Sequence, residues 1–433
     1  MKRVLIISYY WPPSGGAGVQ RWLKFAKYLR SEGWEPVIYT PLNPEYPSTD
    51  PALQMDIPEG ITVLKTPIRE PYMLYKWFSG LKGSEKIQPG FISETKRPAL
   101  AAKISAWIRG NLFIPDARCL WINPSIKYIT KWLQHNKVDA LVSTGPPHSM
   151  HLIALGVKKR MNIPWLADFR DPWTQIDFFP ILMLTPWAES RHKKLEQAVL
   201  ATADRVVTVS QTCAHNLKIL CGRNIEVVAN GYDEDDFGNL PPFSYDSFRI
   251  THLGSLNADR NPHKLWEALA NLVKGDPFFA EKLSVRLIGK TDISVMDSIA
   301  AQGLTGYLEK IDYLPHDQAL NRASQSAVLL LAINNAPNAQ GIATGKLYEY
   351  FALQRPILAI GPENGDAAAL IRQTETGRVA DFDDKDTMIQ ILLGWKEDFL
   401  LRQLDIRSGN SHQHTRRNRT AQLANILDGL TTP

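Results

Sequence analysis

Cysteine is scarce in this sequence, and long apolar runs are missing. The 433 residues include only three cysteines, Cys119, Cys213 and Cys221, with no CxxC pair. An odd, unpaired set of this kind predicts neither a disulfide framework nor a zinc site, and it favours a reducing compartment. No stretch approaches the roughly 18 uninterrupted apolar residues of a transmembrane helix, and the run before Pro12 is too short for a signal-peptide core. We therefore expect neither a membrane span nor a secretion signal.

Compositional bias is absent as well. Hydrophobic residues make up 44% of the chain and charged residues 21%, and no tract is dominated by a few residue types. These values argue against extended disorder, collagen or a coiled coil and favour a globular protein. At roughly 100–200 residues per domain, the length predicts two or three domains.

Charge and tryptophan are distributed unevenly. The net charge is only +5, but residues 1–230 contain 29 Lys and Arg against 18 Asp and Glu, whereas residues 231–433 contain 20 against 26. Ten of the twelve tryptophans also precede residue 190. This pattern fits either solvated charge over core aromatics, or a surface that approaches an anionic membrane or an amphipathic, anionic acceptor. We expect no nucleic-acid partner, because the basic residues are spread out and form no binding motif.

Short β-branched runs alternate with helix-length segments, which is typical of parallel sheets covered by helices. Helices are predicted over Val19–Arg30 and Ser149–Met161 and from about His263 and Gly345. The predicted strands are Val4–Ser8, Pro36–Thr40, Ile61–Thr66, Ala140–Thr144, Trp165–Asp168, Arg205–Val209 and Ile225–Val228 in the first half, and Phe248–Leu253, Leu283–Ile288, Val328–Ala332 and Pro356–Ile360 in the second. The sequence thus predicts an α/β protein with two open α/β units.

Three segments define the predicted domain organisation. The Gly-, Pro- and Asp-rich segment 229–247 reads as an exposed linker, with the boundary near Asn239. We therefore expect domains at 1–239 and 240–395, and a polar helix within 396–433 that packs back on the first domain. The segment from Arg69 to Trp121 interrupts the first domain and contains a helix candidate at 98–113. Its amphipathic pattern fits core packing or a contact with a membrane or acceptor.

Ligands of open α/β sheets bind where strands end and helices begin. After the first strand, Gly15 and Gly16 lie in a Gly-rich turn that either brings backbone amides to a phosphate or sugar or is a simple tight turn. The turn fails the dinucleotide fingerprint because Arg21 occupies the position of the third glycine. This departure argues against a hydride-transfer enzyme.

The second half offers a stronger set of residues. Arg260 follows the strand Phe248–Leu253 in a loop that opens a helix, where it can contact phosphate oxygens. Lys346 and Glu349 lie one helical turn apart at the start of another helix. The cation suits a diphosphate and the carboxylate suits ribose hydroxyls, although an ordinary surface salt bridge has the same spacing.

Several motifs together resemble the retaining nucleotide-sugar glycosyltransferases of family 4. They are YYWPPSGGAGVQR, STGPPHSMHL, IPWLADFRDPW, ANGYDEDDF, THLGSLNADRNP and GKLYEYFALQRPILAI, and the resemblance covers essentially the whole chain. It implies the GT-B architecture, in which two facing Rossmann-like domains with parallel sheets enclose the active site in an interdomain cleft.

The resemblance also implies roles for individual residues in donor binding. Arg260 and Lys346 would hold the donor diphosphate with help from the amides of Gly345 and Leu347, and Glu349 would bind the ribose. The loop with Gly15 and Gly16 would close on the donor. Two positions depart from the family pattern, since Gly341 replaces the first of two glutamates and Ser255 replaces an arginine. The first departure argues against a carboxylate contact to the donor sugar.

Three residues of the first domain are the catalytic candidates. His148 falls where family members place a histidine facing the donor sugar; the alternatives are His151 in that role, or a structural role for both. Asp168 and Arg170 follow the next strand. Asp168 would accept a hydrogen bond from the acceptor hydroxyl, or it would brace the loop together with Arg170.

These observations lead to one main expectation about function. The chain is expected to be a retaining, metal-independent glycosyltransferase of the hexosyltransferase type, with a nucleoside-diphosphate sugar as co-substrate and no cofactor. The expected acceptor is a glycan or lipid-linked glycan in cell-surface polysaccharide biosynthesis. The expected location is the cytoplasm or the inner face of the cytoplasmic membrane. The alternatives are a nucleotide-sugar epimerase or hydrolase of the same fold, or a non-catalytic sugar-nucleotide-binding protein.

Overall fold

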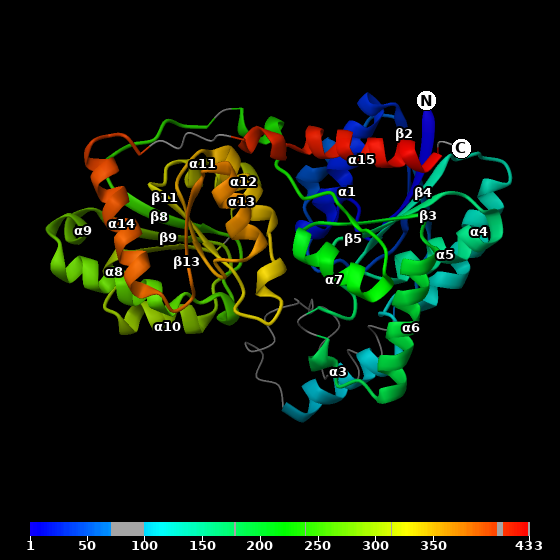
Figure 1. Cartoon of the computed structure of the whole chain (residues 1–433), viewed down its shortest axis with the longest axis horizontal. Coiled ribbons are helices and arrows are strands. Elements are labelled where there is room, and N and C mark those ends of the chain that lie inside the picture. The colour runs from blue at the N-terminus through cyan, green and yellow to red at the C-terminus, as the bar shows by residue number, and fades with distance from the viewer. Residues whose placement is uncertain (71–98, 177–178, 239, 313, 405–409, 432–433) are drawn as a thin grey trace. The chain divides into compact units, whose positions relative to one another are not determined.

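The computed structural model describes residues 1–70, 99–176, 179–238, 240–312, 314–404 and 410–431. The chain divides into two compact units, and Figure 1 shows their elements. The first unit contains Met1–Ala229 and Arg416–Pro433, and the second contains Asn230–Thr415. Within the described residues, none of the helices has the length and apolar character to span a membrane.

The first unit is built on a seven-stranded parallel sheet in the order β3-β2-β1-β4-β5-β6-β7. Helices cover both faces, because successive residues of a buried strand point to opposite sides. Leu5 and Ile7 of β1 pack in one apolar cluster, and Val4 and Ile6 pack in another. The strands are β1 (Lys2–Ile7), β2 (Trp34–Pro41), β3 (Thr62–Thr66), β4 (Ala140–Gly145), β5 (Trp165–Phe169), β6 (Arg205–Thr208) and β7 (Glu226–Val227).

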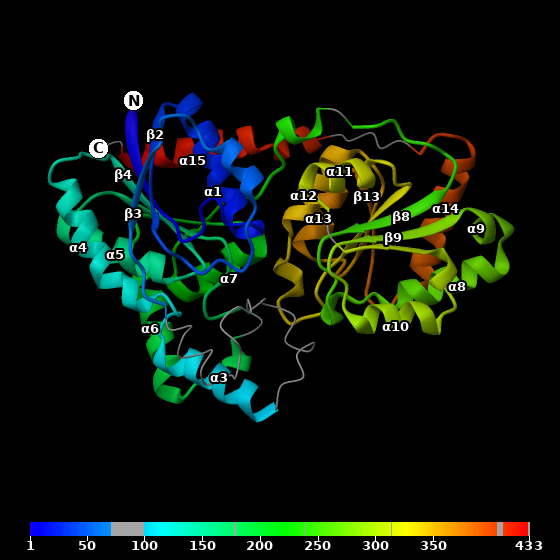
Figure 2. The same cartoon turned by 180° about the vertical axis from the view of Figure 1, so that it is seen from behind.

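The helices of the first unit include one from the far end of the chain. Helix α15 (Arg416–Thr431) lies beside α1 (Ala17–Leu29), as Figures 1 and 2 both show. Lys2 Nζ also lies 2.8 Å from Asp428 Oδ1, which ties β1 to this last helix. The other helices are α3 (Ala99–Leu112), α4 (Ile122–Leu133), α5 (Ser149–Met161), α6 (Pro186–Thr202) and α7 (Gln211–Cys221).

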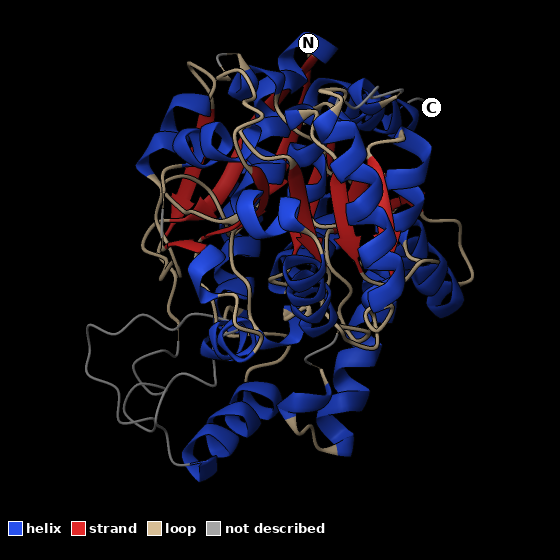
Figure 3. Cartoon of the chain, turned by 90° about the vertical axis from the view of Figure 1, so that its left-hand side faces the viewer, coloured by secondary structure: helices blue, strands red, loops and turns tan. Residues whose placement is uncertain are grey.

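The second unit has a six-stranded parallel sheet in the order β10-β9-β8-β11-β12-β13, and helices flank the strands on both sides in Figure 3. The strands are β8 (Phe248–Leu253), β9 (Leu283–Ile288), β10 (Leu308–Ile311), β11 (Val328–Ala332), β12 (Ile357–Ile360) and β13 (Gly377–Ala380). The helices are α8 (His263–Gly275), α9 (Pro277–Lys282), α10 (Ile293–Ala301), α11 (His316–Ser324), α12 (Gly345–Leu353), α13 (Asp366–Thr374) and α14 (Lys385–Leu400).

The two parallel sheets confirm the predicted fold class, but three details differ from the sequence analysis. Strands β10 and β13 were not predicted. The helix predicted from about Lys396 is two helices, because α14 ends at Leu400 and α15 begins at Arg416. The border between the units lies after Ala229 and not near Asn239. From Asn230 onward, the segment predicted as a linker belongs to the second unit, in which Tyr232 forms a β-bridge with Thr415.

Candidate functional site

Lys346 lies in the first turn of α12, and its ammonium group is held by the strand beneath it. Its Nζ lies 3.2 Å from His252 Nε2 at the end of β8 and 3.4 Å from the Ser255 carbonyl oxygen. His252 Nδ1 lies 3.0 Å from the Leu330 carbonyl oxygen. A carbonyl oxygen only accepts, so this hydrogen bond assigns the proton to Nδ1 and leaves Nε2 to accept from Lys346. His252 therefore positions the lysine.

A glycine makes room for this lysine. Gly254 has a φ of +83°, and a Cβ placed on it would lie 2.8 Å from Lys346 Cε and 3.1 Å from Nζ. Both the left-handed backbone and the close approach favour glycine at this position. The turn after β8 is thus shaped around the lysine side chain.

The site is poised to take up an anion. Burial and, to a smaller extent, the charge of Arg260 lower the pKa of Lys346 to about 7, although Glu349 opposes this change. Burial and the neighbouring Lys346 also hold the pKa of His252 well below its usual value, so this imidazole is neutral. An anionic ligand would relieve the repulsion between the two cations and restore the charge of the lysine.

Arg260 shares a backbone contact with Lys346. It ends the short 3₁₀ turn Ala258–Arg260, where its Nε donates to Asn334 Oδ1 and its Nη1 lies 3.3 Å from the Ser255 carbonyl oxygen. That carbonyl also contacts Lys346. Arg260 lines a pocket of about 120 Å³ beyond the ends of β11 and β12, together with Ile333, Asn335 and ten other residues. Both predicted phosphate cations thus lie at the carboxyl ends of the strands of the second sheet.

The remaining predicted donor contacts surround the start of α12. Glu349 Oε1 lies 3.1 Å from His316 Nε2, and the carboxylate side chain is 31% exposed. Gly345 has open space around its Cα. The Leu347 amide, predicted to face the phosphate, instead donates to the Thr344 carbonyl at 3.1 Å, so it is occupied in the first turn of the helix.

In the first unit, His148 directly precedes α5 and His151 lies in its first turn. His148 is 7% exposed and stacks on Trp173 with ring centroids 4.7 Å apart. His151 has no exposure, and its Nδ1 lies 2.8 Å from Ser143 Oγ. Burial lowers the pKa of both, to about 3 for His151 and well below the usual value for His148, so both are neutral. The greater exposure favours His148 as the ligand contact.

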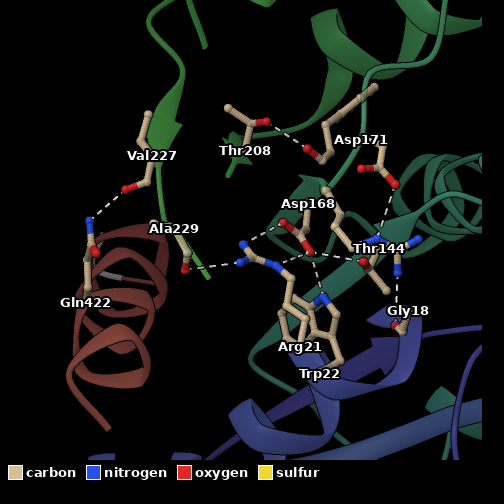
Figure 4. A network of polar contacts seen from close by, with 12 residues as sticks. Gly18, Arg21, Trp22, Thr144, Asp168, Asp171, Thr208, Val227, Ala229 and Gln422 are labelled. Atoms are coloured by element: carbon tan, nitrogen blue, oxygen red, sulfur yellow. Dashed lines mark hydrogen bonds and ion pairs between the residues drawn. The ribbon is translucent and has the colours of Figure 1, made fainter. Parts of the chain in front are cut away.

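Asp168 is fully buried at the end of β5, and Figure 4 shows four donors converging on its carboxylate. Arg21 donates to both oxygens at 2.9 and 3.1 Å, Trp22 Nε1 at 2.7 Å and Thr144 Oγ1 at 3.0 Å. Burial raises the pKa of Asp168, but the Arg21 charge and these hydrogen bonds outweigh it, so the pKa is lowered. Of its two predicted roles, the contacts favour bracing over accepting a bond from an acceptor hydroxyl.

Arg170 connects the start of α1 to the loop after β4. Its Nη1 donates to the Gly18 carbonyl at 2.9 Å, and its Nη2 donates to the Pro146 carbonyl at 3.1 Å. Gly18 lies in the first turn of α1 and Pro146 follows β4, so the guanidinium fixes this turn against the loop. Figure 4 shows the Gly18 contact beside the Asp168 network.

The Gly-rich turn after β1 is held by the segment before Pro51. The Gly15 amide donates to the Ser48 carbonyl at 2.9 Å, and Asp50 donates its amide to Pro13 at 2.8 Å. Gly16 has a φ of +84° at the start of α1, where no side chain caps the helix. The turn therefore leaves the helix N-terminus without an internal side-chain acceptor, as an anion-binding loop requires.

Sequence reasoning missed several residues that shape these sites: His252, Ser255 as a backbone acceptor, Asn334, His316 and Trp173. One signal was present, because a histidine near the end of a buried strand is unusual and requires a polar partner. The partner of His252 is 94 residues away, so the pairing itself had no local signal.

Gly254→Ala is expected to disturb the lysine directly. The new methyl group would meet Lys346 Cε at 2.8 Å and displace the side chain from His252 and Ser255. Affinity for the nucleoside diphosphate that the sequence analysis predicts here should fall by about tenfold or more, since a strained backbone and a misplaced cation act together. Gly303→Ala is the matched control, because φ is +72° but no atom lies within 4 Å of its Cβ position. Equal affinities of the two variants, measured by isothermal titration, would contradict this prediction.

Comparisons with known proteins agree with this arrangement. The sequence profile of Glycosyltransferase Family 4 matches residues 84–236. Sucrose-phosphate synthase from Thermosynechococcus elongatus has a similar structure, with a TM-score of 0.63, 11% identity and 99% of both chains covered. A mutant of S. aureus TarM in complex with fondaparinux, α-GlcNAc-glycerol and UDP is also similar, with a TM-score of 0.60, 11% identity and 100% of both chains covered. WaaG, a glycosyltransferase involved in lipopolysaccharide biosynthesis, has a TM-score of 0.57 and 12% identity. The match covers 98% of this chain and 100% of the WaaG chain.

A search of the curated proteins finds no match. At 10–12% identity, the solved structures establish the fold over the whole chain. Over residues 84–236, which include the motifs STGPPHSMHL and IPWLADFRDPW, the profile match confirms the resemblance to family 4. The chain is accordingly a glycosyltransferase with the GT-B fold of two Rossmann-like α/β domains.

Proposed function

We propose that this glycosyltransferase is a retaining, metal-independent hexosyltransferase. It takes a sugar from a nucleoside-diphosphate sugar and attaches it to a glycan or lipid-linked glycan during cell-surface polysaccharide biosynthesis, in the cytoplasm or at the inner membrane face. The observation that carries this proposal is the cluster of Lys346, Arg260 and His252 at the carboxyl ends of β8 and β11. Two neighbours support a nucleotide-sugar donor by their titles, since TarM was solved with UDP and another protein from E. coli with UDP-2-fluoro glucose.

The chemistry requires stabilisation of a leaving group. The bond between the anomeric carbon and the diphosphate oxygen breaks, and negative charge grows on the nucleoside diphosphate. Lys346 and Arg260 are fixed cations at one backbone carbonyl, 3.4 and 3.3 Å away respectively. Such preorganised charge stabilises the leaving group without reorganisation during the reaction. Glu349 would hold the ribose hydroxyls, and the amide of Gly345 would face the diphosphate.

The acceptor side is assigned to the first unit. His148 would contact the donor sugar with its neutral ring, and Arg170 would keep the first turn of α1, which follows the Gly15 and Gly16 turn, and the loop after β4 in place. Both carboxylate oxygens of Asp168 accept bonds from buried donors. This argues against a covalent glycosyl intermediate on that residue, so catalysis would rest on positioning and charge.

A donor screen tests the proposal. The purified protein is heated with UDP-, GDP-, ADP- or CMP-sugars in the presence of a chelator, and one nucleotide should raise Tm by several degrees because it binds the folded state alone. Glu349→Ala should lose this shift, whereas Glu281→Ala should keep it, because Glu281 lies on α9 with 73% of its side chain exposed. No shift with any nucleotide sugar would overturn the proposal.

Product analysis separates the alternatives. A transferase with an acceptor should give a glycoside that keeps the anomeric configuration of the donor, which NMR reports directly. Release of a sugar isomer or free sugar without an acceptor would assign the chain to the epimerases or hydrolases. One neighbour is titled a putative UDP-N-acetylglucosamine 2-epimerase from Listeria monocytogenes, with a TM-score of 0.55 and 10% identity. The reaction without an acceptor therefore has to be measured as well. Binding without turnover would indicate a non-catalytic protein.

Donor affinity should depend on pH through Lys346. With a pKa of about 7 in the free site, the lysine is charged below that pH and neutral above it. Binding a diphosphate requires the charged form, so above pH 7 binding takes up a proton and the Kd rises by up to about tenfold per pH unit. Below pH 7 the Kd should be constant. Titrations in buffers of different ionisation enthalpy measure the uptake, and Lys346→Arg, which stays charged, should give a flat profile.

A further inference from the structure

Large apolar side chains are exposed together at one corner of the first unit. They come from α3, from the 3₁₀ turn Pro180–Leu182 with the residue after it, and from the start of α6. We call this set the α3–α6 patch: Ile104, Trp107, Leu112, Ile181, Met183 and Trp187. Trp107 and Trp187 are 42% and 68% exposed, and within the part of the chain that the structure describes no other tryptophan is classed as exposed.

The patch is a built surface and not a set of loose side chains. Asn111 of α3 donates to the Met183 carbonyl at 3.2 Å and accepts from the Thr185 amide at 2.7 Å. Gly110 lies so close to Leu182 and Leu184 that a Cβ would meet them at 2.9 and 2.6 Å. The end of α3 at Gly110 and Asn111 is thus anchored, while Ile104 and Trp107 are exposed nearer the start of the same helix.

Positive charge surrounds the apolar side chains. Lys103 and Arg109 are exposed on α3, and Arg191 and Lys194 are exposed on α6. The structure shows no carboxylate within salt-bridge distance of these four cations among the described residues. In the same region Lys193 Nζ lies 2.6 Å from Glu189 Oε1, so this pair adds no net charge to the surface. A cationic rim around tryptophans is the composition that binds an anionic lipid surface, because indole favours the interface and lysine and arginine favour the headgroups.

The patch is connected to the candidate sugar contact. The Gly110 carbonyl of α3 lies 3.4 Å from His192 Nε2 on α6, and His192 Nδ1 accepts from Trp173 Nε1 at 3.1 Å. Trp173 in turn stacks on His148. Three contacts therefore join α3 to His148, and a surface held by the patch would lie near the acceptor side of the site.

We propose that the α3–α6 patch docks the first unit on an anionic lipid bilayer. The inference rests on the proposed function, because a lipid-linked acceptor has to be reached at such a surface. Charge selects this occupant over a second copy of the chain, since a symmetric contact would bring the same cations face to face. Trp107 and Trp187 are the apolar anchors, and Arg191 and Lys194 with Lys103 and Arg109 are the headgroup contacts.

Vesicle flotation tests the proposal with the full chain. The protein should float with vesicles of equal parts phosphatidylcholine and phosphatidylglycerol at low salt, and much less with phosphatidylcholine alone or at high salt. Trp107→Ser with Trp187→Ser should weaken binding by about tenfold or more, because the two exposed aromatic side chains that would insert into the bilayer are lost. Ile219→Ser is the apolar control, since Ile219 is 69% exposed on α7.

A charge-reversal pair supplies a second, independent test. Arg191→Glu with Lys194→Glu should abolish binding to the anionic vesicles, whereas Lys127→Glu with Lys131→Glu changes net charge equally on α4 and should have a small effect. Vesicle binding that both patch variants retain would overturn the proposal, as would self-association of the parent protein that the tryptophan variant disperses. The nucleotide-induced rise in Tm is measured without vesicles, so its loss would overturn the proposed function and leave the docking result to stand separately.

Discussion

Replacing Lys346 by alanine is expected to lower kcat/KM by about 10² to 10³-fold, which corresponds to roughly 3–4 kcal/mol of transition-state stabilisation. The lysine is a cation in a partly buried position, where no water replaces its interaction with a leaving diphosphate. Arg260 alone cannot compensate, because it is bound to Asn334 and to the Ser255 carbonyl. The effect should appear in kcat as well as in KM, since charge on the leaving group grows in the transition state.

The matched control for this prediction is Lys282→Ala. Lys282 ends α9 directly before β9 begins, so it lies at the opposite ends of the strands from the site, and it pairs with Glu281 at 3.0 Å. Initial-rate kinetics on the donor found in the screen should show little change for this variant. A Lys346→Ala enzyme whose kcat/KM stays within about threefold of the parent value would show that the lysine does not stabilise the leaving group. That result would also contradict the proposed donor site.

The second large effect is on stability. Asp168→Asn is expected to lower the free energy of unfolding by about 3–5 kcal/mol, because Arg21 would remain buried without its counter-charge. Arg21 and Asp168 have side-chain exposures of 1% and 0%. The new amide nitrogen would also face the N–H groups of Arg21 or Trp22, so at least one buried donor would lose its acceptor. Calorimetry should show the transition of the first unit shifted downward by roughly 10 °C.

Asp428→Asn is the control for this variant. Its pair with Lys2 belongs to the same unit, but the two side chains are 49% and 44% exposed, so the change should stay within about 0.5 kcal/mol. The experiment also decides the role of Asp168. An Asp168→Asn protein that keeps the parent Tm but loses acceptor-dependent turnover would restore the acceptor contact and contradict the bracing role.

Acid should act on the same network. Because the pKa of Asp168 is depressed in the folded protein, its ion pair contributes stability above the ordinary carboxyl pKa and loses it as pH falls through the lowered value. The stability of the Asp168→Asn protein should therefore depend less steeply on pH in that acidic range.

Burial explains which strands could be predicted. The strands β8, β9 and β11 have the predicted bounds, since β11 is a continuous apolar run and β8 and β9 begin with apolar residues at alternate positions. Strands β10 and β13 lie at the two edges of the second sheet and are largely half-buried or exposed. Their residues Leu308–Ile311 and Gly377–Ala380 include charged side chains, so neither period nor β-branching distinguished them from loops.

Candidate residues could be found by the same local reasoning, but their roles could not. The spacing of the motifs identified Arg260 and Lys346 as candidates, and both side chains contact the Ser255 carbonyl oxygen in the structure. The two roles of Asp168 depended on Arg21, which is 147 residues away and was noted only because it is not glycine. Partnerships across such distances follow from strand order, which a single sequence does not encode.

The packing of α15 has a consequence for biosynthesis. Residues 230–415 form the second unit as one uninterrupted stretch, whereas the first unit needs Arg416–Thr431 to cover α1 and to contact Val227 through Gln422. A growing chain therefore completes its second unit before the first, although the first begins at the N-terminus. Until the last helix emerges from the ribosome, the apolar side chains that Leu423 and Leu427 cover remain unprotected. Loss of that helix is expected to send the first unit toward aggregation, while the second folds normally.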